Sequence, residues 1–167
     1  SVPYFGLLTD EGRKADWIVE VKTSRKPEAQ LLGSAIGMKV MEKVPYVIGL
    51  DKYFSSLDDD AKAYLKDFGA ATASNGAVGL YHIENLTPEA VDLGRALIKE
   101  NAPTYVIDDE ELDRIEKGYP IIWKDKDATP KLAFIGCPHL SRAQLSSWSK
   151  RIHESLNAKG KDKVSIK

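Results

Sequence analysis

The sequence predicts a three-layer αβα fold with a mostly parallel sheet of about five strands. Short apolar, β-rich runs alternate with longer stretches of helical period, which is the pattern of βαβ units. The most apolar run, residues 131–136, is typical of a strand buried on both faces. With 167 residues the chain can build one core, so we expect a single α/β domain over 1–157 and a solvent-facing tail over 158–167.

The expected strands share apolar or β-branched residues bounded by polar or turn residues, and they cover 16–21, 45–50, 77–83, 104–108 and 131–136. Between the first two, Pro27 fits the first turn of a helix that reaches Val40. Gly33 and Gly37 lie one turn apart on that helix and would let another backbone approach closely.

Start and stop signals define the remaining helices. Asp58 is placed to cap a helix that ends at Asn75-Gly76, and Thr87-Pro88 begins another, expected over 87–101. A short polar helix is expected around 109–118.

The last helix has a complete start signal. Ser141 and Gln144 are spaced as a capping box, and Leu140 and Leu145 are spaced as a hydrophobic staple. Trp148, Ile152 and Leu156 continue at helical spacing, so we expect a buried stripe along this helix.

Composition excludes several classes of protein. The chain has 24 basic and 25 acidic residues and a net charge of -1, so it lacks the positive charge that nucleic acid or an anionic membrane would attract. One cysteine cannot form an internal disulfide, and no apolar stretch approaches the length of about 20 residues that spans a bilayer. The N-terminus also lacks signal-peptide character, and we therefore expect a cytoplasmic location.

Ligands of open α/β sheets bind beyond the carboxyl ends of the strands, and polar residues follow every expected strand. These residues are Lys22 to Ser24, Asp51, Lys52, His82, Glu84, Asn85, Asp108, Asp109 and Cys137 to His139. Polar loops are also required simply to solvate the backbone, so this agreement suggests a site without defining one.

Cys137 offers three interpretations. It lies between an apolar strand and a helix N-terminus, where amide donors and the helix dipole favour a thiolate that could bind a metal or act as a nucleophile. His139 is close enough in sequence to be considered as a base, although spacing does not establish that the two side chains meet. A free cysteine can equally pack as a small hydrophobic residue.

The glycine-rich segment 69–79 lacks the spacing of dinucleotide or phosphate-binding loops. Its small residues are consistent with tight packing, but Ser74 and Asn75 could present polar groups to a ligand. His82, at the end of an expected strand, is either a hydrogen-bonded structural histidine or a ligand-binding residue.

Three stretches in this order resemble the large subunit of the aconitase X family. They are "PYFGLLTDEGRKADWIVEV" at the start, "KDFGAATASNGAVGLYHIENLTPEAV" in the middle and "FIGCPHLSRAQL" near the end, and the resemblance covers nearly the whole chain. The last two stretches are the specific ones.

The resemblance implies a hydro-lyase of the aconitase type, whose iron-sulfur cluster is held by three cysteines. Cys137 matches one of these metal ligands, and His139, Ser141, Ser74, Asn75 and His82 are the residues expected to contact an anionic substrate. The chain departs from the family pattern because it has a single cysteine. We therefore expect an internal segment of a longer large subunit that holds no cluster and has no activity by itself.

The implied partners are the small subunit of the same enzyme and the flanking domains of the large subunit. The expected reaction is dehydration of mevalonate 5-phosphate, with cis-3-hydroxyproline as the alternative substrate. A non-catalytic α/β module that binds a small anion is the competing interpretation, and exposure of the Cys137 sulfur distinguishes it from the lyase.

Overall fold

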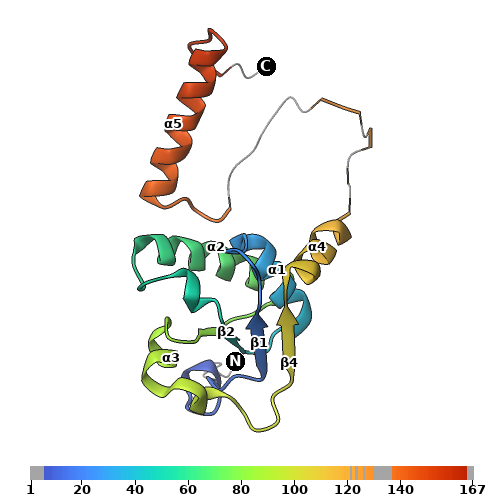
Figure 1. Ribbon diagram of the computed structural model, residues 1–167, viewed down its shortest axis with the longest axis vertical. Coiled ribbons are helices and arrows are strands. Elements are labelled where there is room, and N and C mark those ends of the chain that lie inside the picture. The colour runs from blue at the N-terminus through green and yellow to red at the C-terminus, as the bar shows by residue number, and fades with distance from the viewer. Residues whose placement is uncertain (1–5, 121, 123, 126, 130–136, 165–167) are drawn as a thin grey trace, which may run out of the picture. The chain divides into compact units, whose positions relative to one another are not determined.

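The structure is a computed structural model that describes residues 6–120, 122, 124, 125, 127–129 and 137–164 (Figure 1). The chain divides into two compact units, Ser1–Pro120 and Ile121–Lys167. The first unit contains the sheet and the second contains one long helix. The strand expected over 131–136 lies outside the described residues.

In its described part, the first unit has a four-stranded parallel sheet in the order β3-β2-β1-β4. The strands are β1 (Trp17–Val21), β2 (Pro45–Ile48), β3 (His82–Ile83) and β4 (Thr104–Ile107). The α/β class and the parallel sheet are thus confirmed. The segment 77–83 was expected to be a strand throughout, but only its last two residues pair with β2.

The helices and 3₁₀ turns of the first unit are, in chain order, η1 (Gly6–Leu8), α1 (Ala29–Val40), η2 (Asp51–Tyr53), α2 (Asp59–Gly76), α3 (Pro88–Leu93), η3 (Gly94–Leu97) and α4 (Asp109–Gly118). The second unit contains α5 (Arg142–Ala158). The Asp58 cap is confirmed, because its carboxylate accepts a hydrogen bond from the Ala61 amide at 2.8 Å. None of the described helices is both long and apolar enough to cross a membrane.

The helix predicted over 87–101 is shorter than expected. Pro88 does begin it, but α3 ends at Leu93 and the chain continues as the 3₁₀ turn η3. Gly94 has a φ of 54°, which a helix cannot continue through. The Thr87 hydroxyl accepts a hydrogen bond from the Ile83 amide at 2.9 Å instead of capping α3, so it closes the turn after β3.

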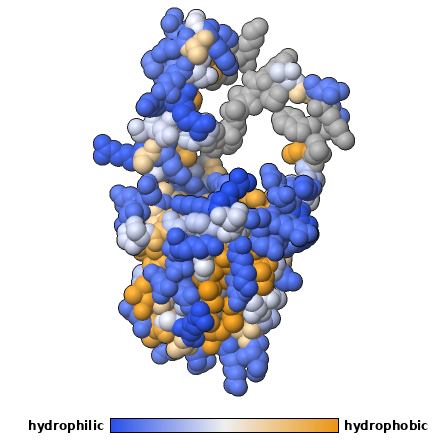
Figure 2. Space-filling model, viewed as in Figure 1, coloured by the Kyte–Doolittle hydropathy of each residue, from blue (hydrophilic) through white to orange (hydrophobic). Residues whose placement is uncertain are grey.

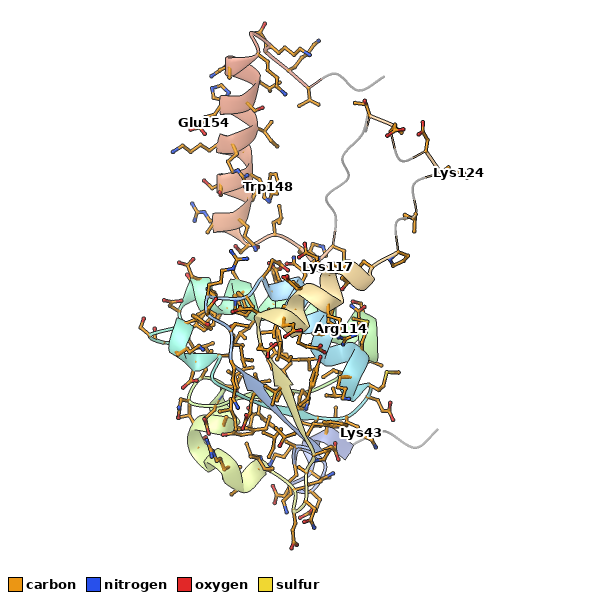
Figure 3. All side chains as sticks on the ribbon, turned by 45° about the vertical axis from the view of Figure 1, so that its right-hand side comes forward. Lys43, Arg114, Lys117, Lys124, Trp148 and Glu154 are labelled. Atoms are coloured by element: carbon orange, nitrogen blue, oxygen red, sulfur yellow. The ribbon has the colours of Figure 1, made fainter. Side chains whose placement is uncertain are left out.

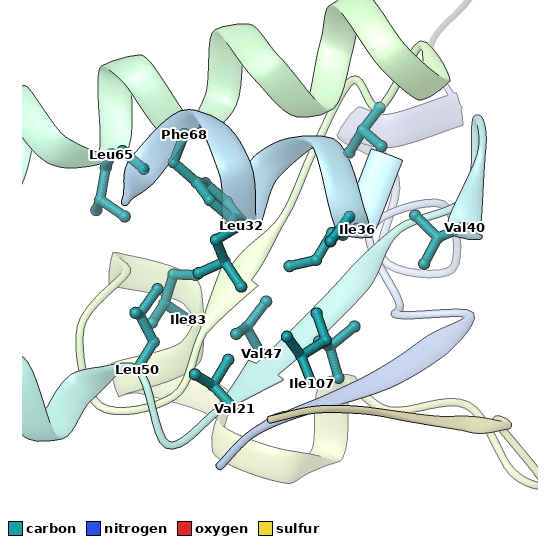
Figure 4. Packing of buried hydrophobic residues seen from close by; sticks show 14 of the residues in the cluster. Val21, Leu32, Ile36, Val40, Val47, Leu50, Leu65, Phe68, Ile83 and Ile107 are labelled. Atoms are coloured by element: carbon teal, nitrogen blue, oxygen red, sulfur yellow. The ribbon is translucent and has the colours of Figure 1, made fainter. Parts of the chain in front are cut away.

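Two apolar clusters lie on opposite faces of the sheet, as the αβα prediction requires. The larger cluster joins α1 and α2 to the strands, with Leu32 and Ile36 of α1 and Phe68 of α2 packed over Val47 and Ile107 (Figure 4). The smaller cluster lies on the other face and contains Ala15, Val44, Tyr46, Ala90 and Leu97. Each strand therefore directs alternate side chains into different layers.

The cover of the second face does not extend across the whole sheet. Thr104 and Val106 of β4 point away from the larger cluster and are exposed, Val106 by 42%. Apolar residues also gather on the side of the first unit seen in Figure 2, over the region where Figure 1 shows β1 and β4. The first unit thus has an apolar face that its own helices leave open.

Helices α1 and α2 approach each other backbone to backbone. A Cβ atom placed on Gly33 would lie 2.5 Å from the Phe68 carbonyl oxygen, and one on Gly37 would lie 2.7 Å from that of Thr72. A Cβ on Gly76 would lie 2.0 Å from the Gly37 oxygen. The close approach predicted from Gly33 and Gly37 is confirmed, and it explains the small residues Ala71 and Gly76 on the facing side of α2.

Gly37→Ala should therefore destabilise the first unit by about 1–3 kcal/mol, because the added methyl group meets backbone that cannot rotate away. Urea unfolding followed by far-UV circular dichroism measures this change. Gly118→Ala is the control, since nothing lies within 4 Å of a Cβ at the end of α4. It should leave stability unchanged or raise it by up to about 1 kcal/mol. Equal effects of the two substitutions would contradict the close packing.

Candidate functional site

The loops at the carboxyl edge of the sheet are tied to one another in the order of the strands. The loop after β3 contacts the loop after β2 through Asn85, whose side-chain amide donates to Asp51 at 2.8 Å. The loop after β1 contacts the start of α4, because the Ser24 amide donates to both carboxylate oxygens of Asp109 at 3.1 and 3.2 Å. Ser24, Asp51, Asn85 and Asp109 thus come together as predicted, but their polar groups already bond to one another.

Thr23 connects the loop after β1 to the loop after β2. Its carbonyl oxygen accepts hydrogen bonds from the Tyr53 hydroxyl at 2.8 Å and from Lys52 Nζ at 3.2 Å. The Thr23 hydroxyl lies 3.0 Å from the same tyrosine oxygen. Thr23 is buried, so these contacts satisfy a backbone carbonyl that water does not reach freely.

An aromatic pair holds the loop between β1 and α1. Lys26 Nζ lies 4.1 Å from the ring centroid of Phe54 and 4.7 Å from that of Tyr64, within cation–π range. The Tyr64 hydroxyl donates to the Pro27 carbonyl at 3.1 Å. Burial, followed by the nearby Glu28 charge, raises the pKa of Tyr64, so this donor stays protonated. The sequence pattern gave no reason to select these aromatic residues.

An open hollow of about 700 Å³ lies between this loop, α1 and α4. Its lining includes two cations, Arg25 and Lys26, and four carboxylates, which belong to Glu28, Asp109, Asp113 and Glu116. The acidic side chains outnumber the basic ones, which opposes binding of a phosphate or carboxylate here. The hollow is therefore a weak candidate for an anion site.

The helix after β4 is fixed by a short polar cluster. The Tyr105 hydroxyl donates to Glu111, and Arg114 donates to both oxygens of this carboxylate at 2.6 Å. The Arg114 guanidinium, helped by the Tyr105 hydroxyl, lowers the pKa of Glu111 to about 2 despite partial burial. Burial first and Glu111 second raise the pKa of Tyr105. These contacts hold the first turns of α4 against the sheet.

The lowered pKa of Glu111 predicts a pH dependence of stability. The ion pair contributes fully above the ordinary glutamate pKa of 4.5 and is lost as the pH falls toward 2. The free energy of unfolding should therefore fall more steeply between pH 5 and pH 2 in the unaltered chain than in Glu111→Gln. Glu110→Gln, one residue away and exposed, should keep the original slope. Parallel curves for the chain and Glu111→Gln would disprove this role.

The second unit holds the predicted thiol at the start of its helix. Cys137 is exposed, and its peptide bond to Pro138 is cis. The capping box of α5 is confirmed: the Ser141 oxygen accepts from the Gln144 amide at 3.2 Å, and the Gln144 side chain accepts from the Ser141 amide at 2.8 Å. The exposure of Cys137 among the described residues favours the metal-ligand interpretation over that of a buried hydrophobic residue.

His82 is placed as a structural residue of the first unit. Its side chain is fully buried, and Nε2 lies 2.7 Å from the Arg13 carbonyl oxygen, so this nitrogen carries the proton and donates. It is the parallel partner of Tyr46 across the β2–β3 pair. Among the described residues, His82 Nδ1 and the Tyr46 hydroxyl have no hydrogen-bond partner.

Ser74 and Asn75 lie at the end of α2. Because α2 runs back from the carboxyl edge before β3 begins, this end is at the amino edge of the parallel sheet. The Asn75 side-chain amide donates to the Ser34 hydroxyl at 3.1 Å and to the Ala71 carbonyl at 2.9 Å, and Ser74 donates to the same carbonyl at 3.2 Å. The structure thus does not bring these two residues to the loops that follow the strands.

His82→Asn should lower the free energy of unfolding of the first unit by about 1–3 kcal/mol. The shorter asparagine side chain no longer reaches the Arg13 carbonyl, so this buried acceptor loses its hydrogen bond. His153→Asn is the matched control on the exposed surface of α5 and should change stability by less than about 0.5 kcal/mol. Chemical unfolding of both variants measures the difference. Unaltered stability of His82→Asn would favour a purely ligand-binding histidine.

The described residues contain no group of three or more His, Cys, Asp or Glu side chains placed to hold a metal ion. The chain has one cysteine, and that cysteine is exposed. The donor set therefore fits one ligand of a larger inorganic centre, but not the whole centre.

The first unit is thus an α/β unit with a parallel sheet, and the second exposes one thiol before a capped helix. The pattern of the aconitase X second domain matches residues 15–117. This chain belongs to the aconitase X family.

Relatives and a solved structure agree with this assignment. The phosphomevalonate dehydratase large subunit of Thermococcus kodakarensis is 34% identical over 163 residues, which are 96% of this chain and 37% of that relative. The cis-3-hydroxy-L-proline dehydratase of Hypocrea jecorina is 31% identical over 98% of this chain and 27% of its own length. The crystal structure of Thermococcus kodakaraensis aconitase X in its holo form matches with a TM-score of 0.66 and 32% identity, and covers 95% of this chain and 37% of that one. The chain thus spans about a third of the length of its relatives.

Proposed function

We propose that this chain is part of the large subunit of an iron-sulfur hydro-lyase that removes water from mevalonate 5-phosphate. The observation that carries the proposal is the exposed Cys137 thiol at the start of the capped helix α5, in a chain of the aconitase X family. Several relatives are named phosphomevalonate dehydratase large subunits, including those of Methanosarcina mazei, 32% identical, and Methanocaldococcus jannaschii, 31% identical.

With its single cysteine, this chain would provide one ligand of the cluster. Cys137 would provide one thiolate of the cluster, and because the sequence contains no other cysteine, the remaining thiolates come from parts of the large subunit outside it. The isolated chain should therefore bind no cluster and have no dehydratase activity.

When bound, a cluster with an open iron supplies a Lewis acid for the departing hydroxyl group. The residues around Cys137 would orient this site. The Ser141 oxygen acts as an acceptor in the capping box, which leaves its hydroxyl hydrogen available to donate to an anionic substrate. His139 lies in the same exposed turn and is our second candidate for a substrate contact. Ser74, Asn75 and His82 stay weaker predictions, since their polar groups bond within the first unit.

The proposal implies two kinds of partner. The relatives named as large subunits imply a small subunit, and the covered fraction of those relatives implies further large-subunit domains around this chain. We place the enzyme in the cytoplasm, where an unpaired cysteine stays reduced and able to bind iron.

cis-3-Hydroxyproline is the alternative substrate, because relatives with that activity in their names match nearly the whole chain. Assay of the assembled large and small subunits with each compound separates the two. Turnover of mevalonate 5-phosphate alone would support the proposal. Turnover of cis-3-hydroxyproline alone would show that it, and not mevalonate 5-phosphate, is the substrate. A complex that binds small anions and turns over neither compound would indicate a non-catalytic module.

Cys137→Ala in the complete large subunit, reconstituted anaerobically with iron and sulfide, should abolish the visible absorption of the cluster. Dehydratase activity should fall by more than about 100-fold, beyond the loss caused by changes around a metal site. Ser147→Ala, on the exposed surface of α5, should retain both signals. Unchanged cluster content in Cys137→Ala would remove this residue from the metal site.

A further inference from the structure

Helix α5 carries an apolar stripe that is exposed among the residues that the structure describes. Leu145, Trp148 and Ile152 are 60%, 38% and 42% exposed, although the sequence predicted a buried stripe. Together with Leu140 and Leu156 they line a shallow hollow of about 460 Å³. In Figure 3, Trp148 and Glu154 are labelled along this helix. A row of large apolar side chains on an amphipathic helix is normally covered in the folded protein.

The border of the stripe is cationic. Arg151 lies with its guanidinium 5.1 Å from the Trp148 ring centroid, and Arg142 begins the helix on the other side of the stripe. Neither arginine forms an ion pair within the described residues. A surface that covers the stripe should therefore be apolar at its centre and carry carboxylates at its margin.

We propose that the stripe of α5 is the surface on which the part of the large subunit outside this chain docks. This inference rests on the proposed function. The hollow begins at Leu140, three residues after Cys137, so any segment that brings further cysteines to a cluster at Cys137 must lie beside the first turns of α5. About two thirds of the T. kodakarensis relative lies outside the matched region, which is ample to supply that cover.

A second copy of this chain is a poorer occupant. A two-fold antiparallel pair of α5 helices centred on Trp148 and Ile152 would bring Arg151 of one copy close to Arg151 of the other, and like charges at a border oppose association. A partner with carboxylates at the margin has no such repulsion.

Hydrogen exchange measured by mass spectrometry tests the proposal on α5 amides in two proteins, this chain alone and the complete large subunit. In the complete subunit these amides should exchange at least about tenfold more slowly, because docking suppresses local opening. Ile152→Glu, within the stripe, should remove most of this added protection. Ser147→Glu adds the same charge on the opposite surface of the helix and should preserve it.

Three results would overturn the proposal. Equal and slow exchange in both proteins would mean that this chain covers its own stripe, and protection of the isolated chain that grows with concentration would mean that a second copy does. Equally fast exchange in both would mean that no docking occurs. Loss of the cluster with α5 still protected would refute the proposed function alone, so the two failures are distinguishable.

Discussion

The approach of α1 to α2 is the constraint on which the first unit depends. At Gly33, Gly37 and Gly76 the two backbones come so close that no Cβ atom fits between them. This contact brings Leu32, Ile36 and Phe68 into one layer over the sheet, and that layer contains most of the buried apolar residues. Because α1 and α2 begin at the carboxyl edge of the sheet, their packing also fixes where the loops of that edge start.

Those loops illustrate why a polar edge is not in itself an active site. Each described strand is followed by polar groups, as expected for an open parallel α/β sheet, but the bonds of Thr23, Asp51 and Asp109 join neighbouring loops into a continuous network. The group with clear chemical capacity lies in the second unit, where Cys137 is exposed beside a helix N-terminus. In the function that we propose, the first unit acts as a scaffold and Cys137 of the second unit binds the metal.

Much of the fold was predictable because the signals were local. Asp58 caps α2, Ser141 and Gln144 form the capping box, and the glycines of α1 lie at the close approach, each for the reason that its residue type suggested. The segment before β3 was not predictable, because a short apolar run fits a strand or an extended connection equally well. Nor could the sequence show that His82 donates to Arg13, since that contact joins residues 69 positions apart.

The candidate site was predictable in part. A lone cysteine before a helix gives a physical reason to consider a metal ligand, but residue types alone do not indicate which centre it would join. The sequence could not reveal Lys26 between Phe54 and Tyr64, or the acidic lining of the nearby hollow, because both depend on how distant segments meet. The open stripe of α5 was likewise expected to be covered, since helical periodicity reports which face is apolar and not what lies against it.

We propose that this chain donates a single thiolate to an iron-sulfur cluster whose other ligands come from outside it. The sharpest test is anomalous diffraction at the iron edge from crystals of the assembled enzyme. We predict an iron atom at bonding distance from Cys137 Sγ, with its other protein thiolates from large-subunit segments beyond this chain. Iron bound entirely by other cysteines, with Cys137 left as a free thiol, would contradict the account.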